Sequence, residues 1–433
     1  MDIRQSIEDQ PVSWLQLLVL LICFALNILD GFDIVAISYA APAISDAWSL
    51  SATNLGIVFS AGLAGMTVGA MFLAPVTDVI GRRKMILIAL VINAISLAAT
   101  AWSQTLWQLV AARFVVGLSI GSMLASLTAL VAEYMPARHR NLAVCILQCG
   151  YPIGATGGGF LAAWLIPVHG WESVFLFGLL ITVLAIPVVY FALPESLEYL
   201  AKRRPASALQ ITNRVRARME LPALHELAEG EDKDIPSAQV HSLLTADNRR
   251  KTLLLWAAYF FCFFTLYFLI SWIPKILVEN GFTQDQGINA GIAFNGGGIL
   301  GVLMLGYLAD KKGLTRLIGL FLAIGCVSLL AFGTISAGFA VTLLLSFVVG
   351  IFVNGGFVGL YAMAAGLYPT EIRTTGIGWA IGAGRFGGIA GPYVGGLLVA
   401  AQLPLPLTIA IFALSLIFAI AAVWLMPKDA LVS

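Results

Sequence analysis

Long apolar segments, separated by short polar turns, follow one another along this chain from Trp14 almost to its last residue. Each segment is about 20 residues long, which is the length that an α-helix needs to cross the hydrocarbon core of a bilayer. The pattern therefore predicts an all-α membrane protein with twelve transmembrane helices, which start near Trp14, Thr53, Met85, Leu106, Asn141, Glu172, Thr252, Gln286, Leu317, Val341, Gly376 and Pro404.

One long polar stretch, from about Pro194 to Lys251, divides the apolar segments into six and six. Short motifs recur at matching positions of the two halves. Asp78-Val-Ile-Gly81-Arg82-Arg83-Lys84 after the second segment matches Gly306-Tyr-Leu-Ala-Asp310-Lys311-Lys312-Gly313 after the eighth, and Pro136 with Arg140 matches Pro369 with Arg373. This repeat predicts two pseudo-symmetric six-helix bundles, residues 1–193 and 251–433, joined by a cytoplasmic linker, residues 194–250.

The positive charges predict the orientation. All of the 24 Lys and Arg residues except Lys275, Arg113 and Arg385 fall on one side of the membrane, together with both termini. Because cytoplasmic loops carry the excess of cations, we expect both termini in the cytoplasm of a cell whose inner membrane holds the protein. The first segment runs on past any small-residue cleavage point, so no signal peptide is expected.

Composition excludes several function classes. Only 11% of the residues are charged and mean hydropathy is +0.93, whereas soluble domains carry about 25% charged residues. The net charge of +1 argues against a nucleic-acid partner. The five cysteines lack CxxC spacing and nearby histidines, so no disulfide frame or metal site is expected. No Gly-Lys-Ser/Thr sequence occurs, which argues against an ATP-driven pump. We expect a monomer in lipid, with no cofactor and no enzymatic activity.

The loop after the second segment resembles the G-x-x-x-D-R/K-x-G-R-R/K signature of the major facilitator superfamily. Ala74 replaces its glycine and Val79 its first basic residue. Arg113-Phe-Val-Val-Gly117 is similar to the R-x-x-x-G pattern of the same superfamily, and Pro194-Glu195-Ser196 to the P-E-S ending shared with sugar porters. The resemblance extends over nearly the whole chain and implies the major facilitator fold.

A narrower resemblance rests on the first segment. Leu29-Asp30-Gly31-Phe32-Asp33 is similar to the D-G-x-D signature of the aromatic acid:proton symporters. Gly384-Arg385-Phe-Gly387-Gly388-Ile-Ala-Gly391-Pro392 in the eleventh segment also resembles that family. The resemblance implies a transporter of benzoate-like or related aromatic acids.

Charged side chains inside the apolar segments need a partner or a purpose, because each costs about 2.5 to 3.5 kcal/mol near the middle of a spanning helix. From the helical rise, Asp33 and Arg113 share a level in the outer half of the membrane. Asp30 and Asp33 face one side of their helix. They predict either a structural ion pair with Arg113 or a proton site at which that pair forms and breaks. Arg385 predicts capture of a substrate carboxylate, or a structural pair with another helix.

Charge arithmetic suggests the coupling. The two aspartates and the two arginines sum to zero, a bound monoanion leaves −1, and one proton restores balance. Together with the resemblance to the aromatic acid:proton symporters, this arithmetic predicts a secondary active transporter that imports a small, aromatic carboxylate by proton symport with alternating access. A proton-coupled drug antiporter and a transporter-like ligand sensor remain as alternatives. The former typically carries a Gly-Pro-rich signature in the fifth helix rather than the eleventh, and no signalling domain supports the latter.

Two further sets of residues complete the prediction. Polar and aromatic residues along the segments are candidate substrate contacts, since small-ligand sites are mostly apolar with a few placed polar groups. They are Gln148, Tyr151, Tyr267, Trp272, Asn295, Asn354, Tyr361 and Trp379. Glu133 lies near several arginines at the cytoplasmic end and predicts a gate or a network that clamps the loops. The gating candidates are Asp78, Gly81, Arg82, Arg83, Glu133, Arg140, Asp310 and Arg373.

Overall fold

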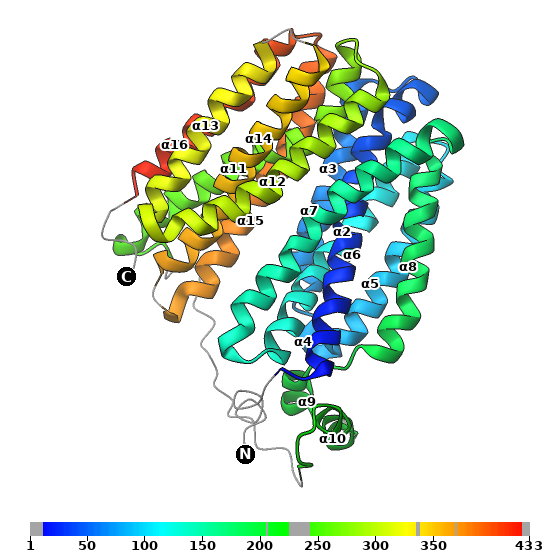
Figure 1. The fold of residues 1–433 in the computed structure, drawn as a ribbon, viewed down its shortest axis with the longest axis vertical. Coiled ribbons are helices and arrows are strands. Elements are labelled where there is room, and N and C mark those ends of the chain that lie inside the picture. The colour runs from blue at the N-terminus through cyan, green and yellow to red at the C-terminus, as the bar shows by residue number, and fades with distance from the viewer. Residues whose placement is uncertain (1–11, 205–206, 225–242, 335–337, 369, 427–433) are drawn as a thin grey trace. The chain divides into compact units, whose positions relative to one another are not determined.

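A computed structural model describes residues 12–204, 207–224, 243–334, 338–368 and 370–426. The described residues form helices and no strand. In lipid this is expected, because a helix satisfies its backbone hydrogen bonds within one segment. The helices are α2 Trp14–Trp48, α3 Ala52–Val68 continued by the π-helical η1 Gly69–Leu73, α4 Thr77–Ile80, α5 Arg82–Ala101, α6 Leu106–Tyr134, α7 Ala137–His169, α8 Glu172–Ala192, α9 Leu197–Arg203, α10 Ala208–Arg218, α11 Ala246–Glu279, α12 Gln284–Lys312, α13 Leu314–Thr334, α14 Phe339–Leu367, α15 Thr370–Ala400 and α16 Leu405–Trp424 (Figure 1).

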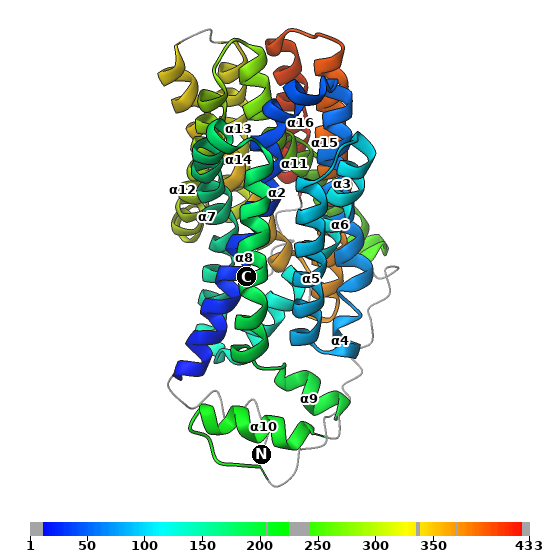
Figure 2. The same cartoon turned by 90° about the vertical axis from the view of Figure 1, so that its right-hand side faces the viewer.

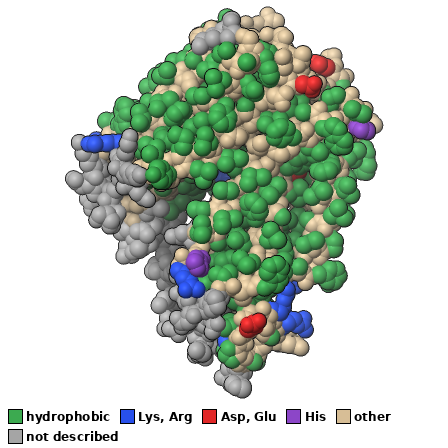
Figure 3. Space-filling view, viewed as in Figure 1, with side chains coloured by type: hydrophobic (Ala, Val, Ile, Leu, Met, Phe, Trp, Pro, Cys, Tyr) green, Lys and Arg blue, Asp and Glu red, His purple; other side chains and the backbone are tan. Residues whose placement is uncertain are grey.

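Ten of these helices are long and apolar enough to cross a membrane. The two other long helices, α7 and α15, are not among the ten, because glycines and polar residues lower their hydropathy. Large apolar side chains are exposed on the long helices, Phe191 at 79% and Trp164 at 68% among them. Figure 3 shows hydrophobic side chains covering most of the visible face, with few charges. Such a surface suits lipid rather than water and confirms the all-α membrane fold.

The contacts divide the chain into two compact units. Unit 1 is Met1–Ile34, Ala64–Gly154 and Phe175–Lys233, and unit 2 is Val35–Leu63, Ala155–Val174 and Asp234–Ser433. The division cuts α2, α3, α7 and α8, so that one part of each belongs to unit 2. The bundles predicted at residues 1–193 and 251–433 follow the sequence repeat instead, and their boundaries stay a prediction.

In unit 1, α5 packs on α6, and α6 also contacts η1. Gly31 lets α2 lie directly against α7, since a Cβ atom at this position would overlap the Tyr151 carbonyl group. Figure 2 shows the short helices α9 and α10 crossing the direction of the long ones, and α9 contacts α4 and α6.

In unit 2, the second half of α2 packs against α11. Pro274 lacks an N–H group, so the carbonyl of Ile270 loses its helical donor. The Ser38 hydroxyl supplies a replacement, because Ser38 Oγ donates to Ile270 O at 2.7 Å. From α12, Asn295 Nδ2 donates to Tyr39 Oη of α2 at 3.2 Å. Polar contacts thus join α2 to α11 and α12 in this unit.

Candidate functional site

The charged group predicted in α2 and α6 is buried in unit 1. Asp33 is 0% exposed and Arg113 is 2% exposed. Arg113 Nη2 donates to the backbone carbonyl of Asp33 at 2.7 Å, and its guanidinium lies 5.7 Å from the centre of the Phe175 ring. The Asp33 carboxylate instead accepts a hydrogen bond from Asn93 Nδ2 on α5 at 2.6 Å. Among the described residues no ion pair joins the two charged groups, so they meet through the main chain.

Asp30 has different surroundings. It is 1% exposed, and neither carboxylate oxygen has a hydrogen-bond partner among the described residues. Nε and Nη1 of Arg113 are likewise buried without partners there. Buried charged groups without partners are costly, which makes them candidates for binding a proton or a ligand.

Arg385 belongs to unit 2, at the middle of α15, and is half-buried. Among the described residues no carboxylate lies within ion-pair distance of it. Its charge reaches the hydroxyl groups of Tyr267 on α11 and Tyr361 on α14. Gly384 and Gly388, its neighbours on α15, lie against the rings of α11, where a Cβ atom would come within 2.7 Å of Phe263 and 3.0 Å of Tyr267. Three predicted site residues, Arg385, Tyr267 and Tyr361, are therefore brought together.

The other candidate substrate contacts have varied surroundings. Trp272 is fully buried and donates from Nε1 to Pro392 O at 3.0 Å. Asn295 and Asn354 donate from Nδ2 to carbonyl groups of their own helices at 3.0 Å. Trp379 is 44% exposed and stacks on Trp256, with ring centroids 5.9 Å apart. On α7, Gln148 is exposed and Tyr151 is half-buried. Their role in binding stays a prediction.

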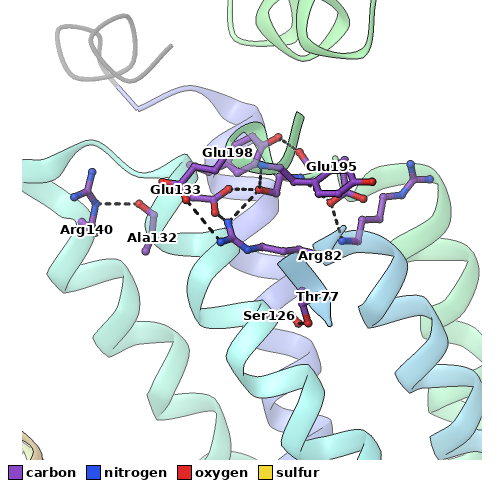
Figure 4. A network of polar contacts seen from close by, with 12 residues as sticks. Thr77, Arg82, Ser126, Ala132, Glu133, Arg140, Glu195 and Glu198 are labelled. Atoms are coloured by element: carbon purple, nitrogen blue, oxygen red, sulfur yellow. Dashed lines mark hydrogen bonds and ion pairs between the residues drawn. The ribbon is translucent and has the colours of Figure 1, made fainter. Parts of the chain in front are cut away.

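Three gating candidates of unit 1, Arg82, Arg83 and Glu133, belong to one network of polar contacts (Figure 4). Arg82 at the start of α5 makes an ion pair with Glu133 near the end of α6. Ser196, the N-cap of α9, joins both residues, since Ser196 Oγ donates to Glu133 Oε2 at 2.5 Å and accepts from Arg82 Nη1 at 3.0 Å. Arg82 Nη2 also lies 3.7 Å from Glu198 Oε2. The network ties α5, α6 and α9 together.

Glu195 extends this network. Its Oε1 accepts from the backbone N–H groups of Arg83 and Ser196, at 3.0 and 2.9 Å. Gly81 has a φ of 103°, a conformation that glycine adopts freely, and a Cβ atom there would meet the Glu195 carboxylate. Arg83 also bonds to the Tyr190 carbonyl. The glycine of the loop motif is thus needed for the close approach of the P-E-S motif.

Arg140 lies apart from the ion pair and donates from Nε to Ala132 O at 2.9 Å. The side chains of Asp78, Asp310 and Arg373 lie outside the described part of the structure. Two functional residues were not predicted from the sequence: Asn93, which donates to the Asp33 carboxylate, and Glu195, which joins the network around Arg82. Asn93 interrupts an apolar segment, and that interruption was the available signal; Glu195 stood in a motif that was used only as a resemblance.

Comparison with known proteins identifies the family. The family model described as Major Facilitator Superfamily matches residues 23–336 and, in a second match, residues 255–432. This chain belongs to the Major Facilitator Superfamily. Members of the superfamily are transporters rather than enzymes. A solved bacterial homologue of the human lysosomal transporter Spinster, in an inward-facing and occupied conformation, has the same fold with a TM-score of 0.76. It is 15% identical, and the match covers 96% of this chain and 98% of that one.

Two similar proteins indicate which group of the Major Facilitator Superfamily this chain belongs to. A gallate transporter from Pseudomonas putida is 32% identical over 94% of this chain and 90% of its own length. A 4-hydroxybenzoate transporter from Pseudomonas aeruginosa is 34% identical over 92% of this chain and 90% of its own length. The resemblance carried by the Asp30-Gly31-Phe32-Asp33 motif is therefore confirmed: this chain belongs with the transporters of aromatic acids.

Proposed function

We propose that this protein imports a small, aromatic carboxylate together with a proton, by alternating access. The observation that carries the proposal is the set of buried ionic groups in a chain whose relatives transport gallate and 4-hydroxybenzoate. Both relatives' substrates are aromatic acids that are anions at neutral pH. A protein that takes up such an anion needs a cation to bind it and an acid to carry the balancing proton.

The proton-coupling residues in this proposal are Asp30, Asp33 and Arg113. All three are at most 2% exposed. In this site Asp33 and Arg113 balance each other in charge, while the Asp30 carboxylate has no hydrogen-bond partner within the described ranges. A buried carboxylate without a partner is stable only when it is neutral or when a cation approaches. Binding and release of one proton at this aspartate pair would offset the charge of each monoanion that binds and leaves.

Arg385 is the proposed substrate-binding cation. Its planar guanidinium suits the two oxygens of a carboxylate, and no acidic residue within the described part of the chain competes for it. Tyr267 and Tyr361 beside it supply aromatic surface and hydroxyl groups. The remaining predicted contacts would complete the binding of the ring.

The network around Arg82 and Glu133 is the proposed cytoplasmic gate. It joins the start of α5 and the end of α6 to α9, which follows the last spanning helix of unit 1. By the distribution of cations, this network and both termini lie on the cytoplasmic side of the inner membrane. The protein is proposed to act as a monomer.

Uptake into proteoliposomes tests the proposal. Radiolabelled 4-hydroxybenzoate should accumulate when the lumen is made alkaline, and should fail to do so when only a membrane potential is imposed. Arg385→Ala should abolish accumulation, whereas Lys275→Ala, which removes a cation outside the proposed site, should preserve it. Outward exchange against protons would favour an antiporter, and binding without flux would favour a sensor.

A further inference from the structure

Three tyrosines, Tyr259, Tyr267 and Tyr361, lie near Arg385 in unit 2. The Arg385 charge reaches Tyr267 and Tyr361, and Tyr361 packs edge-on against Tyr259, with ring centroids 5.5 Å apart. Tyr259 also lies against α15 next to Arg385, because a Cβ atom at Gly384 would come within 3.2 Å of the Tyr259 Cβ atom. Tyr259 and Tyr267 belong to α11, and Tyr361 belongs to α14.

Two phenylalanines pack beside these tyrosines. Phe263 lies between Tyr259 and Tyr267 on α11, with ring centroids 6.0 and 5.6 Å from theirs. Phe357 meets Phe263 at 4.8 Å and Tyr361 at 5.4 Å, both edge-on. Aromatic rings prefer edge-on and offset packing, so these rings offer surfaces to another planar ring.

The hydroxyl group of Tyr259 is the unexplained feature. Tyr259 is 0% exposed, and its hydroxyl has no hydrogen-bond partner among the described residues. A buried hydroxyl without a partner costs free energy, and a phenylalanine would fill the same space without that cost. The unpaired group therefore points to a ligand that supplies the missing hydrogen bond.

We propose that Tyr259 determines specificity by forming a hydrogen bond with a ring hydroxyl of the substrate, so that the substrate class is hydroxylated aromatic acids. This inference rests on the proposed function. With the substrate carboxylate at Arg385 and the substrate ring against Phe263 and Phe357, a hydroxyl group on that ring reaches Tyr259. A benzoate without a hydroxyl leaves the Tyr259 hydroxyl unpaired and binds more weakly.

The test compares uptake of 4-hydroxybenzoate and benzoate by the full-length protein and by Tyr259→Phe. In the unmodified protein the KM for 4-hydroxybenzoate should be about tenfold lower than that for benzoate, as expected for one buried hydrogen bond. Tyr259→Phe should raise the KM for 4-hydroxybenzoate about tenfold and leave that for benzoate unchanged. Tyr393→Phe on α15, where the side chain is 42% exposed, is the matched control and should change neither value.

Thermal unfolding separates specificity from structure. Because the hydroxyl has no partner among the residues that the structure describes, the Tm of Tyr259→Phe should equal or exceed that of the unmodified protein without substrate. Equal KM changes for both acids, no change for either, or a lower Tm would overturn the assignment of Tyr259. If the unmodified protein takes up both acids with the same KM, the assignment of Tyr259 fails and the proposed function stands. If it accumulates neither acid, the proposed function itself is wrong.

Discussion

Glu133→Gln should loosen the docking of α9 on unit 1. Glu133 is buried, its side chain is 5% exposed, and it contacts both Arg82 and Ser196. Glutamine keeps the size and one acceptor oxygen but removes the negative charge. Arg82, whose side chain is 13% exposed, would then lose its buried charged partner, while its contacts with Ser196 and the more distant Glu198 would remain.

The structure sets the size of this effect. Removing one partner of a fully buried pair costs about 3 to 5 kcal/mol, and a hydrogen bond to a charged group contributes about 1.5 to 3 kcal/mol. Arg82 is partly exposed and keeps a second carboxylate at 3.7 Å, so the loss should be near the lower range, at about 2 kcal/mol. A change of about 2 kcal/mol corresponds to roughly a 30-fold change in an equilibrium constant.

Amide hydrogen exchange measures this loss where it should occur. In lipid nanodiscs, the amides of Leu197–Arg203 should exchange roughly 30-fold faster in Glu133→Gln than in the unmodified protein. Glu198→Gln is the matched control: Glu198 has a side chain that is 43% exposed, so its contribution should be about 0.5 kcal/mol and the change about twofold. Equal exchange in Glu133→Gln and the unmodified protein would refute the account of this network.

Three further predictions concern α2. Asp30→Asn should abolish pH-driven accumulation and preserve substrate counterflow, which requires no net proton movement; loss of both would mean that Asp30 has another role. Ser38→Ala should lower the free energy of unfolding by about 0.6 kcal/mol, and by no more than about 1.7 kcal/mol. The reason is that the Ile270 carbonyl, which has no helical donor because of Pro274, would lose the Ser38 hydroxyl as its donor. An unchanged Tm would contradict this prediction. Gly31→Ala should abolish stable expression, because the new Cβ atom would overlap the Tyr151 carbonyl group. Gly157→Ala is the control, since a Cβ atom there meets nothing within 4 Å, and this variant should fold normally. Fluorescence-detected size-exclusion chromatography measures both variants.

Much of the fold was predictable because apolar length is a strong signal in membrane proteins. The starts expected near Trp14, Leu106 and Glu172 agree with the helix bounds. Others differ by several residues, as at Asn141, where α7 begins at Ala137. Helix ends in polar loops carry no apolar signal, so hydropathy alone cannot define them.

The sequence predicted the level in the membrane at which the charged residues lie, but not which atoms they contact. The helical rise put Arg113 at the level of Asp33, and its guanidinium does contact the Asp33 carbonyl. That contact is to the main chain of Asp33, while the Asp33 carboxylate accepts a hydrogen bond from Asn93. Which of several polar atoms a buried arginine meets depends on rotamers and on neighbouring helices, and a single sequence does not contain that information. The same holds for Tyr259, which looks in the sequence like any other aromatic residue of an apolar segment.

The ratio of protons to substrate molecules tests the central claim most directly. Proteoliposomes that contain a pH-sensitive dye can report proton entry while radiolabelled 4-hydroxybenzoate reports substrate entry, and a solid-supported membrane can report net current. The account predicts one proton for each monoanion and no net current at any imposed potential. Substrate entry without proton entry, or a steady current that scales with substrate flux, would contradict it.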